Sequence, residues 1–164
     1  MQITGNTIAI SGANRGIGLA LASMFANEKN ELILINRKRD EQLESKLTSL
    51  GAPRVQTLTC DFSDLKQTEA ISKELAQHHI DVLVNNAGLL TGGQLEKQTS
   101  KEIIDMFNVN LISLVLLTKH ILPGMISRGR GKIINNASVS GKMFLPSANT
   151  YAASKAGVVG FTES

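Results

Sequence analysis

The sequence predicts an α/β protein built on a doubly wound parallel sheet. Two observations carry this prediction. Short apolar runs of strand length alternate with helix-periodic segments along the chain, and a glycine-rich turn follows the first of those runs. Continuously apolar strands are typical of parallel sheets that are covered by helices on both faces. Right-handed crossovers between such strands favour the strand order 3-2-1-4-5.

The first half of the chain gives two strand–helix units. A strand is expected over 7–11, followed by the glycine turn and a helix from about residue 16 to 27. A second strand over 32–35 precedes a charged amphipathic helix over 40–50. The glycine and proline that come directly after it are expected to end this helix.

The second half continues the alternation. Strands are expected over 55–59, 82–84 and 132–135. Helices are expected over 64–77 and 101–128, and a last helix begins near Tyr151. The apolar residues available for the inner face of the 64–77 helix are Leu65, Ala70, Ile71 and Leu75.

Residues 1–164 are expected to form a single domain. This length suits one hydrophobic core, and the sequence contains no internal repeat, low-complexity tract or linker. The last expected helix carries no C-cap glycine, and we interpret the chain as incomplete at its C-terminus. The fifth strand would then form an open sheet edge, which favours association.

Composition excludes several classes of function. The chain has 17 Lys and Arg against 14 Asp and Glu, and its net charge of +3 is scattered; aromatic residues make up only 4%, so no nucleic-acid partner is expected. Cys60 is the single cysteine and no Cys/His group has zinc spacing, so we predict no metal site. We interpret the adjacent His78 and His79 as a surface pair.

No segment predicts a membrane partner. The first residues lack a basic stretch that leads into an apolar core. The longest apolar stretch, 111–122, contains polar residues and is shorter than the ~18–20 apolar residues of a membrane span. We therefore expect a cytoplasmic protein.

The turn after the first strand is a candidate phosphate site. Residues 11–18 read Ser-Gly-Ala-Asn-Arg-Gly-Ile-Gly, with the spacing Gly-x3-Gly-x-Gly. Glycines allow the backbone to approach a pyrophosphate closely, and the N–H groups at the start of the next helix attract it. The alternative is an ordinary tight strand–helix connection. The position of the turn after the first strand favours dinucleotide binding.

The end of the second strand predicts the type of dinucleotide. A carboxylate at this point would select NAD, but the chain has Asn36 followed by three cations. Arg37, together with Arg15 of the glycine turn, predicts NADP(H) rather than NAD(H), because a guanidinium suits a 2′-phosphate. Lys38 and Arg39 could instead be solvated charges before the next helix.

The chemistry is predicted at the opposite end of the chain. Tyr151, the only tyrosine, and Lys155 are four residues apart and share one helix face, where the cation would favour the phenolate. The alternative is an exposed helical pair. Ser138 follows the fifth strand and therefore belongs to the loops that face the ligand crevice. Asn110 is polar within an apolar helical stretch and needs a partner if it is buried, although it could also be a structural, helix-bending asparagine.

Together these residues resemble the classical short-chain dehydrogenase/reductase family, over the whole chain. The matching pieces are residues 11–18, Asp61, residues 85–88, Asn110, Ser138, Tyr151 and Lys155. Ser11 stands where the family usually has threonine, and Ala137 stands where it often has serine. The resemblance implies a Rossmann-like fold without the last strands and the substrate loop of the family.

The resemblance also implies the roles of individual residues. Tyr151 would be the general acid/base, Lys155 would favour its phenolate and hold the nicotinamide ribose, Ser138 would polarise the carbonyl, and Asn110 would position a proton-relaying water. The residues that would bind the cofactor, besides Tyr151 and Lys155, are Gly12, Asn14, Arg15, Gly16, Ile17, Gly18, Arg37, Asp61, Phe62, Asn86, Ala87 and Gly88.

The resulting prediction is an NADP(H)-dependent oxidoreductase that works as a ketone reductase on a small carbonyl or alcohol substrate. The alternative is a non-catalytic NADP-binding fragment or pseudoenzyme that lacks the substrate-binding part. Met143, Phe144 and Leu145 could line a substrate pocket or pack on the core. In the family, the 101–128 helix and the helix after Tyr151 build a dimer, so a homo-oligomer through them is expected.

Overall fold

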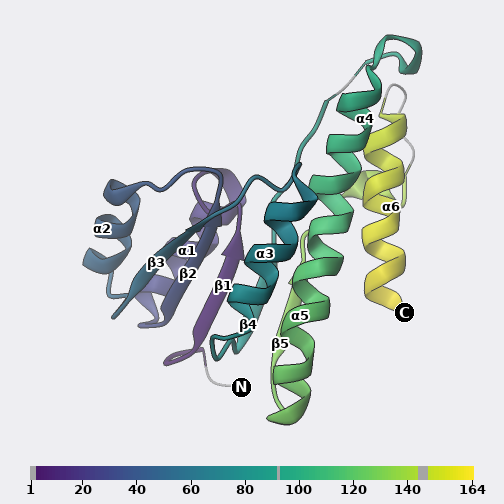
Figure 1. Ribbon diagram of the computed structural model, residues 1–164. Helices are drawn as coiled ribbons and strands as arrows, with labels where there is room; N and C mark the ends of the chain where they lie inside the picture. The colour runs from purple at the N-terminus through teal and green to yellow at the C-terminus, as the bar shows by residue number, and fades with distance from the viewer. Residues whose placement is uncertain (1–2, 92, 144–147) are drawn as a thin grey trace.

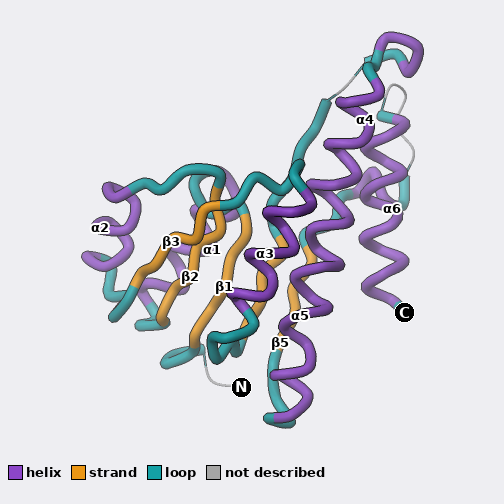
Figure 2. Tube along the Cα trace, in the orientation of Figure 1, coloured by secondary structure: helices purple, strands orange, loops and turns teal. Residues whose placement is uncertain are grey.

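The computed structural model describes residues 3–91, 93–143 and 148–164, and its centre is a parallel sheet. The five strands are β1 (Thr7–Ser11), β2 (Glu31–Asn36), β3 (Val55–Thr59), β4 (Val82–Asn85) and β5 (Lys132–Asn135). Their order is β3-β2-β1-β4-β5, which confirms the predicted order, and every pairing is parallel. Figure 2 shows these strands side by side between the helices.

Helices cover both faces of the sheet, as the apolar strands predict (Figure 1). The helices are α1 (Gly16–Asn27), α2 (Glu41–Ser49), α3 (Leu65–Leu75), α4 (Ser100–Phe107), α5 (Ser113–Ser127) and α6 (Asn149–Glu163). One core cluster packs α1 and α2 against one face, and a second packs α3 and α5 against the other. All five strands carry their carboxyl ends to the same edge, which is where the candidate site lies.

Side-chain caps explain where several helices begin. The Asp40 carboxylate accepts a hydrogen bond from the Leu43 N–H before α2, and Asp64 accepts two from the first turn of α3. Thr99 and Glu102 form a complete capping box at the start of α4. These caps satisfy N–H groups that would otherwise lack partners.

The inner face of α3 differs from the predicted one. Ile71 and Leu75 are buried as expected, but Leu65 is 40% exposed and Ala70 is also exposed. Thr68 and Ser72 are buried in their place. Both hydroxyls donate to the carbonyl four residues earlier, so their polar atoms are satisfied inside the protein.

The predicted 101–128 helix is observed as α4, a π-helical turn η2 (Asn108–Ile112) and α5. Among the described residues, Ser100–Ser127 is the one helical stretch that passes the length and composition test for a membrane span, with a mean hydropathy of 1.6 in its most apolar window. Core helices also pass this test. Here α5 packs against α3, and α4 packs against α6, which runs alongside it in Figure 1.

Candidate active site

The glycine turn lies against the loop that follows β4. Gly12 has φ +69°, and a Cβ there would approach the Cα of Ala87 to 2.9 Å. A Cβ on Gly18 would collide with the Gly12 carbonyl oxygen and lie 2.5 Å from Nδ2 of Asn86. These two positions therefore require glycine because backbone and side chain pass too close for any side chain.

The start of α1 has the features of an anion site. Arg15 is the N-cap residue and forms no side-chain cap hydrogen bond, so N–H groups of the first turn remain available to a ligand. Gly16 has φ +54°, and no atom lies within 4 Å of the position of a Cβ. Ile17 is 62% exposed. An open helix N-terminus beside an exposed apolar side chain fits a phosphate-bearing cofactor.

Two buried polar side chains hold this turn in place. The Ser11 hydroxyl oxygen accepts hydrogen bonds from the N–H groups of Asn86 (2.9 Å) and Ala87 (3.0 Å). Oδ1 of Asn36, at the end of β2, accepts from the Ala13 N–H at 2.8 Å. The hydroxyl at position 11 thus ties β1 to the loop after β4.

The predicted cations separate into two kinds. Arg39 pairs with Glu44 at 2.8 Å, as expected of a solvated charge before α2. Arg15 and Arg37 are exposed, and neither forms an ion pair with any residue that the structure describes. Both guanidinium groups are therefore free to meet a ligand phosphate.

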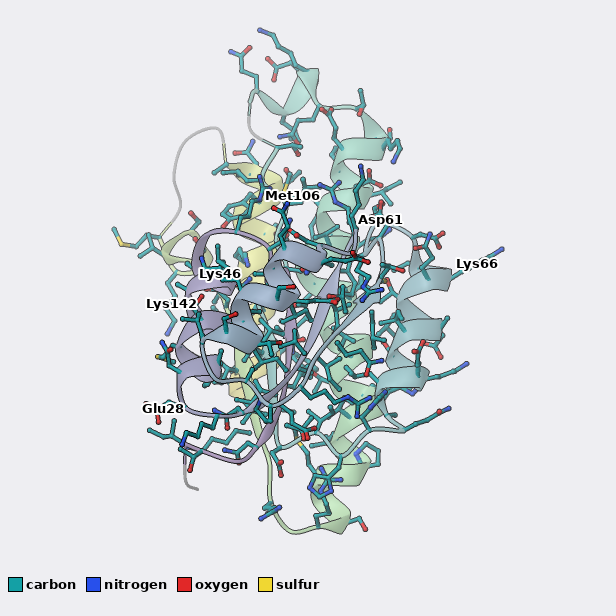
Figure 3. The ribbon with its side chains drawn as sticks, turned by 90° about the vertical axis from the view of Figure 1, so that its left-hand side faces the viewer. Glu28, Lys46, Asp61, Lys66, Met106 and Lys142 are labelled. Atoms are coloured by element: carbon teal, nitrogen blue, oxygen red, sulfur yellow. The ribbon has the colours of Figure 1, made fainter. Side chains whose placement is uncertain are left out.

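Asp61 lies just after β3, near the upper ends of the strands in Figure 3. Its carboxylate accepts hydrogen bonds from the N–H (3.0 Å) and the hydroxyl (2.8 Å) of Ser63. These bonds, helped by the charges of Arg37 and Lys101, hold the pKa of the Asp61 carboxyl below its ordinary value. The carboxylate is therefore ionised and oriented at neutral pH.

Other predicted cofactor residues differ in what they can offer. Asn14 and Gly88 are exposed, and Ala87 is half-buried. Phe62 is 5% exposed and packs in the core with α3 and α5, so its ring is not open to a ligand. The Asn86 amide is occupied within the protein: Nδ2 donates to the carbonyls of Ser11 and Gly12, and Oδ1 accepts from Asn136.

Asn110 lies in the π-helical turn and is 1% exposed. Its Oδ1 accepts from the Leu89 N–H at 2.7 Å, and its Nδ2 donates to the Leu89 carbonyl at 2.9 Å. The same Nδ2 donates to the Ser154 hydroxyl at 3.0 Å, and that hydroxyl donates to the Tyr151 carbonyl at 2.7 Å. Asn110 therefore joins the loop after β4 to the first turns of α6.

Lys155 is buried, with 4% of its surface exposed, which rules out the exposed-pair interpretation for this residue. Its Nζ donates to the Asn136 carbonyl at 2.7 Å. Burial lowers the pKa of the Lys155 ammonium from its ordinary value. A Cβ built on Gly88 would lie 4.0 Å from this Nζ and 3.8 Å from Oδ1 of Asn110, so these three predicted residues come together.

Ser138 is brought to the same place by a short 3-10 helix, η3 (Val139–Gly141). Its hydroxyl oxygen caps this helix by accepting from the Ser140 N–H at 3.1 Å. A Cβ on Gly141 would approach the Lys155 carbonyl oxygen to 2.7 Å, so η3 lies directly against α6. Tyr151 lies in the first turn of α6 and is half-buried.

The residues that could line a substrate pocket are described only in part. Met143 is 63% exposed, while Phe144 and Leu145 lie outside the described residues.

Three residues that hold the site were not predicted: Asn36, Asn136 and Ser154. Each is a small polar residue one or two positions from a predicted one, but nothing in the sequence indicates which group it contacts. Among the residues that the structure describes, no group of three or more His, Cys, Asp or Glu is placed to hold a metal ion.

Comparison with known proteins gives consistent findings. A family model described as short chain dehydrogenase matches residues 6–164. The chain is 32% identical to a 3-oxoacyl-[acyl-carrier-protein] reductase, FabG, of Vibrio cholerae, covering all of this chain and 67% of that protein. It is 33% identical to the ketoacyl reductase HetN of Nostoc sp., covering 98% of this chain and 57% of the relative. The chain thus spans roughly three fifths of the length of such curated relatives.

Solved structures give the same picture. The L-sorbose reductase of Gluconobacter frateurii, complexed with NADPH and L-sorbose, superimposes with a TM-score of 0.91 at 28% identity, covering 99% of this chain and 64% of that one. A metagenomic short-chain oxidoreductase in complex with NADP has a TM-score of 0.90 at 32% identity, covering 98% and 74%. The matching fold is the doubly wound, Rossmann-like sheet described above.

Proposed function

Because the chain belongs to the short-chain dehydrogenase family, we propose that it is an NADP(H)-dependent ketone reductase of the cytoplasm. It would transfer a hydride between NADP(H) and a small carbonyl or alcohol substrate. The observation that carries this proposal is the buried Lys155 ammonium, one helical turn after Tyr151 and against the turn that begins at Ser138. Burying a cation is costly, so this position is best explained by chemistry.

Each residue of the proposed site would have a separate chemical role. Bound NADPH would supply the hydride. Tyr151 would give its phenol proton to the carbonyl oxygen, and the Lys155 charge would stabilise the phenolate that remains. The Ser138 hydroxyl can donate its hydrogen to the same carbonyl oxygen, because its own oxygen already accepts from Ser140. Asn110 would act by holding the first turns of α6 and the loop after β4 in place.

The cofactor would lie across the carboxyl ends of the strands. The first turn of α1 would receive the pyrophosphate, and Gly16 leaves space for it. Arg37 and Arg15 would meet the 2′-phosphate, which selects NADP(H) over NAD(H). Structures of similar proteins that contain NADPH or NADP support this assignment.

Cofactor binding and turnover test the proposal separately. NADPH should bind this chain more tightly than NADH at equal salt, and Arg37→Asp should narrow or reverse the preference. A panel of ketones with NADPH should show turnover that Tyr151→Phe abolishes without loss of NADPH binding. Binding without turnover would support the non-catalytic alternative, and NADH binding as tight as that of NADPH would contradict the cofactor assignment.

A further inference from the structure

A bridge of hydrogen bonds runs from Lys155 to the glycine turn through Asn136, the residue that directly follows β5. The Asn136 N–H donates to the Asn85 carbonyl at 2.9 Å, which continues the pairing of β4 and β5. Its carbonyl accepts from Nζ of Lys155 at 2.7 Å, and its Nδ2 donates to Oδ1 of Asn86 at 2.9 Å. One residue therefore contacts both the buried cation and the amide beneath the glycine turn.

Asn86 is the second link of the bridge. Its Nδ2 donates to the carbonyls of Ser11 (3.1 Å) and Gly12 (3.0 Å). The position of a Cβ on Gly18 lies only 2.5 Å from this Nδ2, so the amide fills the space below the first turn of α1. The orientation of Asn86 consequently affects the glycine turn directly.

Hydrogen-bond direction fixes that orientation. A side-chain amide has one donating and one accepting end. The two carbonyls of the glycine turn require the donating end of Asn86, and the Nδ2 of Asn136 requires its accepting end. The flipped Asn86 amide would place its oxygen against the two carbonyl oxygens and its NH2 group against the donating Nδ2 of Asn136, so Asn136 adds to the preference for the observed orientation.

We propose that Asn136 is a positioning residue that holds the Lys155 ammonium and the glycine turn in a fixed relation by orienting the Asn86 amide. The inference rests on the proposed function, because the two ends of the bridge are the two sides of the proposed cofactor site. It gives Asn136 a role in cofactor affinity that acts through Asn86 and Lys155.

Two variants separate this role from general stability. Asn136→Asp keeps the shape of the side chain but replaces the donor by an acceptor. The Asn86 oxygen then faces the new carboxylate in the observed orientation and the carbonyl oxygens of Ser11 and Gly12 in the flipped one. Asn136→Leu removes the side-chain hydrogen bond to Asn86 without adding an acceptor. The matched control is Asn135→Leu, because the Asn135 side-chain amide bonds to Asn85 and Thr162 and makes no hydrogen bond to Asn86 or to the glycine turn. All three are measured on the 164-residue chain, with melting temperatures alongside.

The first measurement is the NADPH dissociation constant. We expect about a tenfold increase in Asn136→Asp, a smaller increase in Asn136→Leu, and less than about a twofold change in Asn135→Leu. Unchanged NADPH affinity in both Asn136 variants would overturn the proposal, and so would an equal loss in the control. If Asn136→Asp does not fold, the comparison of the two leucine variants decides.

The second measurement needs no cofactor. Amide hydrogen exchange over residues 11–18 should be faster in both Asn136 variants than in the wild type and in Asn135→Leu. If the wild type fails to bind NADPH, the proposed function is wrong. The exchange rates over residues 11–18 then still test whether Asn136 positions the glycine turn. Equal exchange in all four proteins would overturn this positioning role.

Discussion

At the scale of single residues, the site depends on one buried cation and the amides around it. Lys155 loses its hydration inside the protein, and the acceptor found for its Nζ is the Asn136 carbonyl. One hydrogen bond to an uncharged carbonyl offsets only part of the cost of burying an ammonium. The lowered pKa of this side chain is the expected sign of that imbalance.

Stability should therefore depend on pH through Lys155. Its native pKa lies below 10.5, the value of an unburied lysine, so the unfolded chain binds this proton more tightly. The free-energy cost of burying the charged ammonium is full below the native pKa and decreases as the pH rises toward 10.5. Relative to Lys155→Met, the free energy of unfolding of the wild type should rise across that window. Urea denaturation at several pH values measures the free energy of unfolding of both proteins. A difference between them that does not change with pH would contradict the prediction.

The close approach at Gly18 makes a second prediction. Gly18→Ala forces a Cβ into the Gly12 carbonyl oxygen, so we expect a loss of about 1–3 kcal/mol in the free energy of unfolding and weaker NADPH binding. Gly160→Ala is the matched control, because that helical glycine has no atom within 4 Å of its Cβ position. It should be neutral or stabilising by up to about 1 kcal/mol. Equal effects of the two alanines on stability and NADPH affinity would argue against a packed glycine turn.

At the scale of elements, the π-helical turn is where the α4–α5 helix departs from regular geometry. Such turns occur often at functional sites. Here the turn carries Asn110, whose amide satisfies both main-chain polar groups of Leu89 and also Ser154. The irregular turn and the loop after β4 thus stabilise each other.

Removing that amide should be costly. Asn110→Leu leaves the Leu89 N–H and carbonyl without this partner, so we expect the free energy of unfolding to fall by about 2–4 kcal/mol. Asn108→Leu, in the same turn, removes a single hydrogen bond to the Ser63 carbonyl and should cost about 1 kcal/mol. Chemical denaturation compares the two variants, and a smaller loss for Asn110→Leu than for Asn108→Leu would refute this account.

The order and approximate bounds of the elements followed from the sequence because apolar runs, caps and glycines act locally. The inner face of α3 could not be predicted in this way. Thr68 and Ser72 can be buried because their hydroxyls donate to carbonyls of their own helical segment, and apolar periodicity does not indicate such bonds. Most of the candidate site residues could be named from motif spacing together with the family resemblance that the motifs carry. The bridge through Asn136 could not, because its partners become neighbours only once β5 pairs with β4.

At the scale of the whole molecule, the β5 edge of the sheet exposes a large apolar side chain. β5 pairs with β4 on one side, and no strand among the described residues pairs with its other side. Ile134 on this strand is 45% exposed, and Leu122 and Ile126 of α5 are exposed as well. An apolar, unpaired edge of this kind favours association.

We therefore expect this chain to self-associate at high concentration. Ile134→Lys places a charge on the open edge and should shift the chain toward monomer in light scattering. Met24→Lys is the control, because Met24 is 50% exposed on α1, away from that edge. A wild type that stays monomeric at high concentration, or an equal shift in both variants, would contradict this expectation.

The bridge through Asn136 also has a consequence for how the protein folds. Its links join residues 74 or 75 apart between Asn86 and the glycine turn, 50 apart between Asn136 and Asn86, and 19 apart between Lys155 and Asn136. Contacts between distant residues form slowly, because each must first close a long loop of unfolded chain. A partly folded chain could contain β1 and α1 and still lack the amide that braces the turn between them. Competence to bind the cofactor would therefore arise late in folding, together with the docking of the last helix.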